Sequence, residues 1–512
     1  MMKKMRMALL LVLVLSMALG MAGAETRKYG YDGQYTYAIL EDGTAEIVKF
    51  SGNPKSLQIK GWMNGTIKVT RIGERAFAGI TDAEEIIIPD TVQVIGDQAF
   101  MNCRSAVTVT IPDSVTVLGS KAFDRCLALK SIALPNSIEQ IGVNPFVGCT
   151  DLAEILVAEE HPVLATIKNV LFVKAEKRLV CYPQGLTAER YEIPRGIRVV
   201  GTEAFNNCDT LAEVIFPETV LSLEDDVFAG CDGLKEINLP NSLEQIGVNP
   251  FSFCGKLETL RVSDEHPVLA SIDGVLFEKA SKKLVCYPMA FQQATYEVPQ
   301  GIREIGDKAF WWSNVKKVVL PDTVQVIADK AFYYAKQLKD IILPETLTTL
   351  GASAFTGCCA LEVLEIPGSI GVIPANAFEN AGLKLVVVNE GVTAIDAAAF
   401  AMCTSLQEVQ LPTGLTAIGG RAFEWCSDLK KIELPESLKS IGASAFSYCS
   451  ALAQIKLPTS LEEIGKGVFN ACAKELTVEA EENSYAAQWA KAEGVNMKIL
   501  SGDDDLPDWL LN

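Results

Sequence analysis

A phenylalanine recurs through this chain at steps of 22 or 23 residues, interrupted by two steps of 59. A fixed period of this length is the signature of a solenoid, in which each repeat unit contacts its neighbours and cannot bury its apolar side alone. The period predicts about fifteen stacked units, with a continuous phenylalanine column inside the stack. The phenylalanines are Phe77, Phe100, Phe123, Phe146, Phe205, Phe228, Phe251, Phe310, Phe332, Phe355, Phe378, Phe400, Phe423, Phe446 and Phe469.

Each phenylalanine lies in a frame I-G-x-x-A-F-x-x-C, followed by L-x-x-I-x-L, as in the unit from Pro412 to Leu434. The end of the frame alternates with period two before a proline, which predicts a short strand that ends where the N–H donor is missing. The spacings of three and four in the middle predict a single turn of 3₁₀ or α-helix. Because Pro374 replaces the glycine in one unit, we expect that glycine to serve close packing between units rather than a positive φ.

The two long steps contain additional segments near residues 158–193 and 263–298 that closely resemble each other. In the first, VLFVKAEKRLVCYP reads as an apolar strand, a charged turn and a second apolar strand, which predicts a β-hairpin. The spacing of 105 residues between Phe146 and Phe251 indicates a tandem duplication of four units.

The frame I-G-x-x-A-F-x-x-C-x-x-L-x-x-I-x-L-P, with hairpin insertions that end in Tyr-Pro, resembles the BspA-type bacterial leucine-rich repeat proteins. The segments YTYAILEDGTAEIVKF and NSYAAQWAKAEGVNMKIL resemble the usual ends of these proteins, so the similarity covers residues 33–500. The resemblance implies an α/β-type solenoid, a right-handed curved leucine-rich repeat array with short parallel strands on its concave face. For function it implies extracellular binding, since members have been linked to adhesion to host matrix proteins and to other cells.

The first 24 residues have the pattern of a signal peptide. A basic start precedes the apolar stretch Ala8–Leu19 and the cleavage motif Ala22-Gly23-Ala24. The apolar stretch is too short for a secure membrane span, and the sequence holds no other long apolar run. We therefore expect an exported protein, secreted or held non-covalently at the cell surface, with no membrane span once the signal is removed.

The remaining sequence predicts four further regions. They are an N-terminal β segment at 25–66, the solenoid at 67–478, a helix-strand cap at 479–500 and an acidic tail at 501–512. Asn483 or Ser484 is expected to cap the helix, which continues through Glu493 and ends at Gly494.

Charge and motifs exclude several function classes. The formal net charge is −19, and the pI of 4.8 makes nucleic acid a poor partner. The chain contains no nucleotide-binding loop, G-x-S-x-G or H-E-x-x-H motif. The sequence therefore predicts no catalytic residue, no cofactor and no enzymatic activity.

Fourteen cysteines in an exported chain raise the question of disulfides. Eleven of them share one position, three residues after the phenylalanine, and Ser313, Ala335 or Ala381 fills it in other units. A position that accepts Cys, Ala or Ser is small and buried, so we expect packed free thiols. Disulfides between neighbouring units, or a metal site, are the alternatives, although no Cys or His ligand spacing is present.

The two histidines, His161 and His266, lie one in each insertion and before a proline. Four units separate them, on the order of 20 Å at strand spacing, so they cannot share a metal. Cys181 and Cys286 follow twenty residues later, which allows a Cys–His nucleophilic pair. The favoured interpretation is a turn histidine and a core cysteine in a duplicated hairpin.

Two surface features depart from the repeat. Aromatic residues follow the phenylalanine in several units, at Phe253, Trp311, Trp312, Tyr333 and Tyr334, with a smaller pair at Trp425 and Tyr448. If exposed, such residues suit stacking on sugars or anchoring a protein partner, and the alternative is extra packing on the outside of the solenoid. The outward row of the strands mixes apolar and charged residues, which suits protein binding, and the alternative is strand propensity on a solvated sheet.

The sequence thus predicts an exported, non-enzymatic binding protein that acts in adhesion or protein recognition through the solenoid, between about residues 210 and 390. Its expected partner is an extracellular protein, from the host matrix or another cell surface. The alternative is a glycan-binding accessory protein that uses the aromatic residues. The candidate partner-binding residues are Trp311, Trp312, Tyr333, Tyr334, Lys316, Lys317, Lys339 and Ile342.

Overall fold

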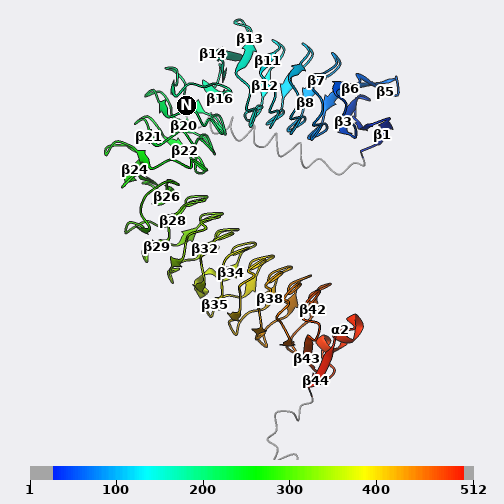
Figure 1. The fold of residues 1–512 in the computed structure, drawn as a ribbon, viewed down its shortest axis with the longest axis vertical. Helices are drawn as coiled ribbons and strands as arrows, with labels where there is room; N and C mark the ends of the chain where they lie inside the picture. Colours follow the sequence, from blue (N-terminus) through cyan, green and yellow to red (C-terminus); the bar gives the residue numbers. More distant parts are fainter. Residues whose placement is uncertain (1–26, 501–512) are drawn as a thin grey trace, which may run out of the picture. The chain divides into compact units, whose positions relative to one another are not determined.

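Successive repeat units stack as rungs in a computed structural model of this chain, which describes residues 27–500. The expected signal peptide, 1–24, and the acidic tail, 501–512, lie outside the described residues. The chain divides along its sequence into two compact units, the first ending at Phe172 and the second beginning at Val173. Within each unit, short strands line up rung after rung and are joined by turns (Figure 1). The predicted parallel-strand solenoid is therefore confirmed.

The first unit opens with an antiparallel pair and then continues in parallel. Its main sheet has the order β1-β2-β3-β6-β8-β10-β12, and β5 pairs with β6. Those strands are β1 (Tyr29–Asp32), β2 (Tyr35–Ile39), β3 (Ala45–Phe50), β5 (Trp62–Met63), β6 (Ile67–Ile72), β8 (Val94–Ile95), β10 (Val117–Leu118) and β12 (Gln140–Ile141). The L-x-x-I-x-L segments, with the strand before them, form β4 (Ser56–Gln58), β7 (Glu85–Ile87), β9 (Thr108–Thr110), β11 (Ser131–Leu134) and β13 (Glu154–Val157).

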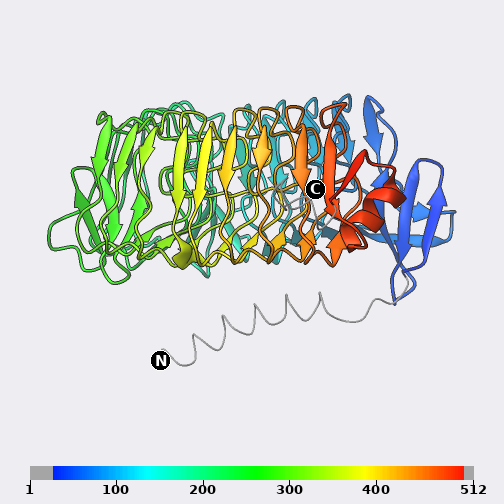
Figure 2. The ribbon, with the colours of Figure 1, turned by 90° about the horizontal axis from the view of Figure 1, so that it is seen from below.

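In the second unit the L-x-x-I-x-L segments form a long-strand row, seen as the yellow-to-orange arrows of Figure 2. Its strands are β17 (Arg190–Glu192), β19 (Glu213–Ile215), β21 (Glu236–Asn238), β23 (Thr259–Arg261), β27 (Thr295–Glu297), β29 (Lys317–Val319), β31 (Asp340–Ile341), β33 (Val363–Ile366), β35 (Leu385–Val388), β37 (Glu408–Gln410), β39 (Lys431–Ile432), β41 (Gln454–Lys456) and β43 (Thr477–Glu481). Central residues of these strands, such as Val318, are buried, whereas their neighbours along the strand point outward.

A short-strand row precedes the glycine of each frame, and the sequence did not predict it because two residues carry no readable periodicity. It comprises β18 (Val199–Val200), β20 (Ser222–Leu223), β22 (Gln245–Ile246), β28 (Glu304–Ile305), β30 (Val326–Ile327), β32 (Thr349–Leu350), β34 (Val372–Ile373), β36 (Ala394–Ile395), β38 (Ala417–Ile418), β40 (Ser440–Ile441) and β42 (Glu463–Ile464). Each rung therefore donates backbone hydrogen bonds to its neighbours from two strands rather than one.

The predicted helical turn in I-G-x-x-A-F-x-x-C is wrong, because this segment consists of successive β-turns. Around Phe100, alternate N–H groups bond within the rung, as from Met101 to the Gln98 carbonyl at 2.9 Å. The N–H groups between them reach the next rung, as from Phe100 to the Ala122 carbonyl at 2.8 Å. A helix cannot form when every second N–H is used between rungs. The one 3₁₀ helix of the described chain, η1 (Gly368–Ile370), lies elsewhere in its rung.

The frame glycine packs against the preceding rung, as the sequence predicted. Gly351 does not have a positive φ, and a Cβ there would lie 2.3 Å from the Asp329 nitrogen. Gly442 is equally close to the backbone of Gly420. The absence of a side chain thus lets neighbouring rungs approach.

The phenylalanine column is confirmed. Phe332 and Phe355 are fully buried, and their rings stack at 4.9 Å with planes 7° apart. The sequence missed two further members, Tyr182 and Tyr287 from the Tyr-Pro motifs of the insertions. Tyr287 stacks on Phe310 at 4.7 Å, and its N–H bonds to the Ala309 carbonyl as a column phenylalanine would. The tyrosine near the end of each insertion therefore occupies the column position of its rung.

The second insertion forms a three-stranded antiparallel meander of β24 (Leu269–Ile272), β25 (Val275–Glu278) and β26 (Lys283–Cys286). The β25–β26 hairpin is the predicted one, and β24 is an additional strand. β26 then pairs in parallel with β28 and rejoins the short-strand row. The first insertion contains β14 (Leu164–Ile167), β15 (Val170–Val173) and β16 (Arg178–Cys181).

The C-terminal segment folds as its sequence indicates. Helix α2 (Tyr485–Glu493) begins after Ser484, whose hydroxyl accepts a bond from the Ala487 N–H at 3.1 Å. It ends at Gly494, which has a φ of 69°. β44 (Met497–Leu500) then pairs in parallel with β43.

Candidate binding surfaces

The cysteine position is structural. All fourteen cysteines are free, and the eleven that follow the phenylalanines are buried except for the half-buried Cys472. Each of the eleven thiols donates to the carbonyl of a column residue in the preceding rung, as Cys403 does to Phe378 at 3.0 Å. Burial raises the pKa of the Cys403 thiol to about 12, so these groups are poor nucleophiles.

Both histidines are turn residues, which removes the Cys–His pair as a candidate. His266 is fully buried, and its Nδ1 accepts bonds from the N–H groups of Val268 and Leu269 at 3.2 and 3.0 Å. Its Nε2 lies 3.1 Å from the Pro240 carbonyl, which fixes the neutral tautomer with the proton on Nε2. His161 repeats this arrangement with Pro135. Within residues 27–500, no three His, Cys, Asp or Glu side chains gather closely enough to hold a metal ion.

The four predicted aromatic residues form one cluster with Phe253. Trp312 stacks on Tyr334 at 5.0 Å with planes 6° apart, and Trp311 lies 5.0 Å from Tyr333. The Lys336 ammonium lies 4.3 Å from the Trp312 ring. The two tryptophans and two tyrosines are half-buried rather than exposed, because successive rungs cover one another's faces, whereas Phe253 at the start of the cluster is 42% exposed.

Several aromatic residues occupy a strained backbone position. The second residue after the column phenylalanine has a positive φ in most rungs, and glycine or asparagine often fills it. Trp312 and Tyr334 hold φ values of 56° and 53° there, and Trp425 and Tyr448 hold 63° and 62°. A bulky residue in this region costs about 1–2 kcal/mol, so packing or function must compensate.

The Trp425–Tyr448 pair is the more exposed of the two aromatic groups, at 46% and 40%. Its rings stack face to face, with centroids 4.0 Å apart and planes 3° apart. Each ring therefore covers the inner face of the other, and the ring edges make up most of the accessible surface of the pair. Sugars stack on ring faces, so this geometry leaves only the outer faces of the pair for such contacts.

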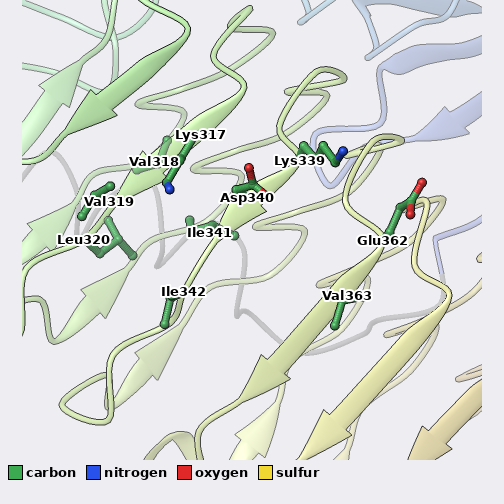
Figure 3. Close-up of a pocket in the computed structure, with 10 residues that line it drawn as sticks. All are labelled: Lys317, Val318, Val319, Leu320, Lys339, Asp340, Ile341, Ile342, Glu362 and Val363. Atoms are coloured by element: carbon green, nitrogen blue, oxygen red, sulfur yellow. The ribbon is translucent and has the colours of Figure 1, made fainter.

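A second surface is a groove on the long-strand row (Figure 3), which we call the strand groove. It has a volume of about 620 Å³ and is lined by residues 317–320, 339–342 and 362–363. Ile342 is 84% exposed, and Val363 and Val319 are 58% and 40% exposed. The same row further along the chain is polar, with Gln410 and Glu433 lining its groove. Exposed aliphatic side chains are thus concentrated at β29, β31 and β33.

The strand groove coincides with a break in the long-strand row. β31 is the last strand of the sheet β27-β29-β31, and β33 begins the separate sheet β33-β35-β37-β39. Similar breaks separate β19 from β21 and β39 from β41, whereas β29 and β31 are bridged, and the N–H groups of Lys339 and Asp340 both donate to the Lys316 carbonyl. Ile342 and Val363 line the groove from the rungs on the two sides of this break.

Lysines flank the groove without carboxylate partners. Within the described chain, Lys316, Lys317 and Lys339 form no ion pair at 4 Å or less, although Asp340 lies opposite Lys317 in the strand register. On the next rung Lys384 bonds to Glu362 at 3.0 Å, and this bond holds the pKa of Glu362 below its ordinary value. Asp340 and Glu362 also line the groove, and the charge of Lys339 helps to lower the pKa of Glu362, so the groove carries charges of both signs.

The structure brings together only some of the predicted site residues. Lys317, Lys339 and Ile342 line the strand groove, and Lys316 lines a neighbouring hollow with Phe291 and Gln337. Trp311, Trp312, Tyr333 and Tyr334 lie outside that groove, in the turn segment of the same rungs. Sequence reasoning missed Val363, which a comparison of the first outward strand position across rungs could have found.

Comparison with known proteins gives the family. The model of the BspA type Leucine rich repeat region (6 copies) matches residues 70–188, 181–297, 303–397 and 371–486. The chain belongs to the BspA-type leucine-rich repeat family. No curated protein matches the chain.

This BspA-type chain is similar to several solved structures. A leucine rich cell surface protein from Faecalibacterium prausnitzii A2-165 is 28% identical, with a TM-score of 0.44 over 80% of this chain and 94% of that one. A leucine-rich repeat protein from Bacteroides ovatus ATCC 8483 is 26% identical, with a TM-score of 0.35 over 93% and 99%. The pneumococcal vaccine antigen PcpA is 18% identical, with a TM-score of 0.38 over 93% and 100%. In this BspA-type chain, no helix within residues 27–500 is long and apolar enough to cross a bilayer.

Proposed function

We propose that this BspA-type chain is an exported, non-enzymatic binding protein that recognises an extracellular protein through the strand groove. The observation that carries the proposal is the exposed side chain of Ile342, 84% accessible on a strand row whose equivalent positions at β37 and β39 are the polar Gln410 and Glu433. An aliphatic residue so exposed gains by burial against a partner, since covering it removes apolar surface from water.

The groove also defines the chemistry of the partner. Ile342 and Val363 offer an apolar floor, and Lys317 and Lys339, which form no ion pair within residues 27–500, offer positive charge beside the carboxylates of Asp340 and Glu362. A protein segment that combines apolar side chains with carboxylates satisfies both, with the apolar contact supplying affinity and the charges supplying orientation and association rate.

The test is a binding panel of host matrix and cell-surface proteins with matched variants. Ile342→Glu places a charge in the groove, and Gln410→Glu places the same charge at the equivalent position of β37, which is already exposed and polar. We expect Ile342→Glu to weaken binding about tenfold or more and Gln410→Glu to leave it unchanged. Equal binding by both variants, or no protein bound by the wild type, overturns the proposal.

A glycan is the second candidate, supported by Trp425 and Tyr448. Both are exposed, and their left-handed position does not require an aromatic side chain, because Met402 and Ala471 fill it in the flanking rungs. The outer face of Tyr448, beside the small Ala471, is where a sugar ring would stack. A glycan array read with the wild type and Tyr448→Ala decides this: loss of a glycan signal supports it, and an unchanged or absent signal contradicts it.

A further inference from the structure

The second insertion interrupts both strand ladders of the second unit at the same place. In the short-strand row, β22 is the last strand of its sheet, and β26 lies in the next sheet with β28. In the long-strand row, β23 ends one sheet and β27 begins another. At other breaks of the second unit only one row is interrupted, as between β31 and β33, where β30 and β32 of the same rungs remain paired. We call the boundary after β23 the junction.

The apolar core also ends at the junction. One core runs through residues 275–487, and Phe251 and Leu260 of the preceding rung lie outside it although both are buried. The rings of Phe251 and Tyr287 do not stack on each other, whereas Tyr287 and Phe310 stack at 4.7 Å. The apolar contact that joins other rungs is therefore reduced here.

Separate hydrogen bonds replace the ladder on the strand side of the junction. The Leu260 N–H donates to the Gly274 carbonyl, and the Ala290 N–H donates to the Leu257 carbonyl, both at 2.9 Å. A hollow of about 180 Å³ is lined by residues of both β22 and β26. The two sides of the junction are thus less closely packed than neighbouring rungs elsewhere in the row.

On the turn side, a side-chain amide replaces the usual backbone bond. In an ordinary rung the column N–H reaches the next rung, as from Phe228 to the Pro250 carbonyl at 2.7 Å. The Phe251 N–H bonds instead to Asn249 Oδ1 of its own rung at 3.2 Å, and Asn249 Nδ2 donates to the Lys308 carbonyl at 2.6 Å. A buried side chain therefore makes the connection across the junction.

Lys308 also reaches back across the junction with its side chain. Its ammonium lies 2.5 Å from Asp226 Oδ2, and Asp226 Oδ1 accepts a bond from the Ser252 hydroxyl at 2.5 Å. The Lys308 and Asp226 side chains are only 20% and 19% exposed, and the ammonium lies 4.8 Å from the Trp311 ring. Charges so shielded from water interact strongly, and removal of one leaves the other poorly solvated. We call Asp226, Asn249 and Lys308 the junction latch.

We propose that the second unit consists of two separately folding blocks, residues 173–262 and 275–500, and that the junction latch couples them. A repeat array is stabilised by its rungs and by the contacts between neighbouring rungs, so it comes apart first where those contacts are weakest. The junction lacks both ladders and a shared apolar core, which leaves the latch to supply much of the coupling. One block can then unfold while the other stays folded. This inference does not rest on the proposed function, because the strand groove lies wholly within the second block.

The test is hydrogen exchange of the full chain over a denaturant series, which gives each segment a midpoint for the loss of protection. We expect a step in this midpoint between residues 262 and 275. Contact across the junction raises the midpoint of whichever block unfolds first, and the other block then unfolds without that contact. Loss of the latch should therefore lower the midpoint of the first block to unfold and leave the other unchanged.

Two variants remove the ion pair from opposite sides of the junction. Lys308→Met keeps the apolar stem beside Trp311, and Asp226→Asn keeps an acceptor for the Ser252 hydroxyl. Although the two substitutions lie in different blocks, both should lower the midpoint of the same block and speed its exchange in native buffer about tenfold. The double variant should add little, because either substitution alone breaks the pair.

Arg178→Met is the matched control. It breaks a similar ion pair, 2.6 Å long with side chains 29% and 28% exposed, between Arg178 and Glu224 inside the first block. It should lower the midpoint of residues 173–262 alone. A wild type without a step between residues 262 and 275 overturns the proposal, whether or not the variants fold. So does a pair of latch variants that each lower only the midpoint of their own block, or that change neither.

Discussion

The Cys231 thiol donates a hydrogen bond to the carbonyl oxygen of Phe205, 2.9 Å away in the preceding rung. That carbonyl also accepts the N–H of Cys208 from its own rung at 3.2 Å. The cysteine therefore fills a small buried space and supplies a weak donor to an oxygen that faces the next rung. This relationship recurs along the column and explains why cysteine dominates the position.

Serine should be a worse replacement than alanine for Cys231. The shorter C–O bond leaves the hydroxyl too far from the Phe205 carbonyl, and the natural Ser313 hydroxyl at this position has no partner within the described chain. We expect Cys231→Ser to lower the free energy of unfolding by about 1–3 kcal/mol and Cys231→Ala by about 1 kcal/mol. Denaturant unfolding measures both, and a serine variant as stable as the wild type contradicts the hydrogen-bond account.

Thiol titration should find one fast-reacting cysteine in the native chain. Cys359 is exposed, whereas the other thirteen thiols are buried or half-buried, and burial raises the pKa of Cys403 to about 12 and that of Cys472 to about 11. We expect a single rapid equivalent of a thiol reagent, which Cys359→Ser removes. Unfolding without a reductant should then expose all fourteen thiols, and a smaller number reveals disulfides between rungs.

Protonation of His266 should destabilise the second unit. Burial lowers the pKa of this imidazole below 6.5, Lys279 lowers it further, and the Pro240 carbonyl and Glu218 oppose both effects. Because the folded pKa is depressed, the stability linked to His266 is fully present above pH 6.5 and is lost as the pH falls through the folded pKa. The difference in unfolding midpoint between the wild type and His266→Asn should therefore shrink from pH 7.5 to pH 5. A constant difference contradicts the assignment.

The two buried tyrosines of the second insertion should respond differently to loss of their hydroxyls. The Tyr287 hydroxyl donates to the Gln293 carbonyl at 3.2 Å, whereas the Tyr296 hydroxyl has no partner within the described residues. Tyr287→Phe should cost about 0.5–1.5 kcal/mol, and Tyr296→Phe should be neutral or stabilising. Thermal unfolding of the two variants ranks them directly, and the reverse order rejects these contacts.

Truncation inside the column should act locally. Phe355 is fully buried between Phe332 and Phe378, at 4.9 and 5.5 Å. Phe355→Ala should cost about 3–5 kcal/mol, confined mostly to its own rung and the two that flank it, because repeats contact only their neighbours. Hydrogen exchange should show lost protection around residues 332–378, and uniform loss along the chain contradicts a rung-by-rung stack.

Substitutions at the left-handed position, the second residue after the column phenylalanine, distinguish backbone strain from side-chain packing. Met402 holds a φ of 61° with its side chain exposed, so Met402→Gly should leave stability unchanged or raise it by about 1 kcal/mol. Trp312→Gly relieves the same strain but removes the stack on Tyr334 and the contact with Lys336, so it should lower stability. If both variants change stability in the same direction, the aromatic cluster does not stabilise these rungs.

The repeat period alone determined the solenoid, the buried phenylalanine column, the packed thiols and the glycine contacts, because each repeated position meets the same position in the next rung. Local signals also determined the α2 cap and the hairpin from Val275 to Cys286. They could not show that Phe100 donates its N–H to the next rung, which converts an expected helical turn into β-turns. Nor could they show that Tyr287 continues the phenylalanine column, because the insertion interrupts the repeat spacing that assigns residues to that position. The strand groove was decided only by tertiary structure, because the sequence does not show that β31 and β33 lie in separate sheets or that Val363 lines the same groove as Ile342.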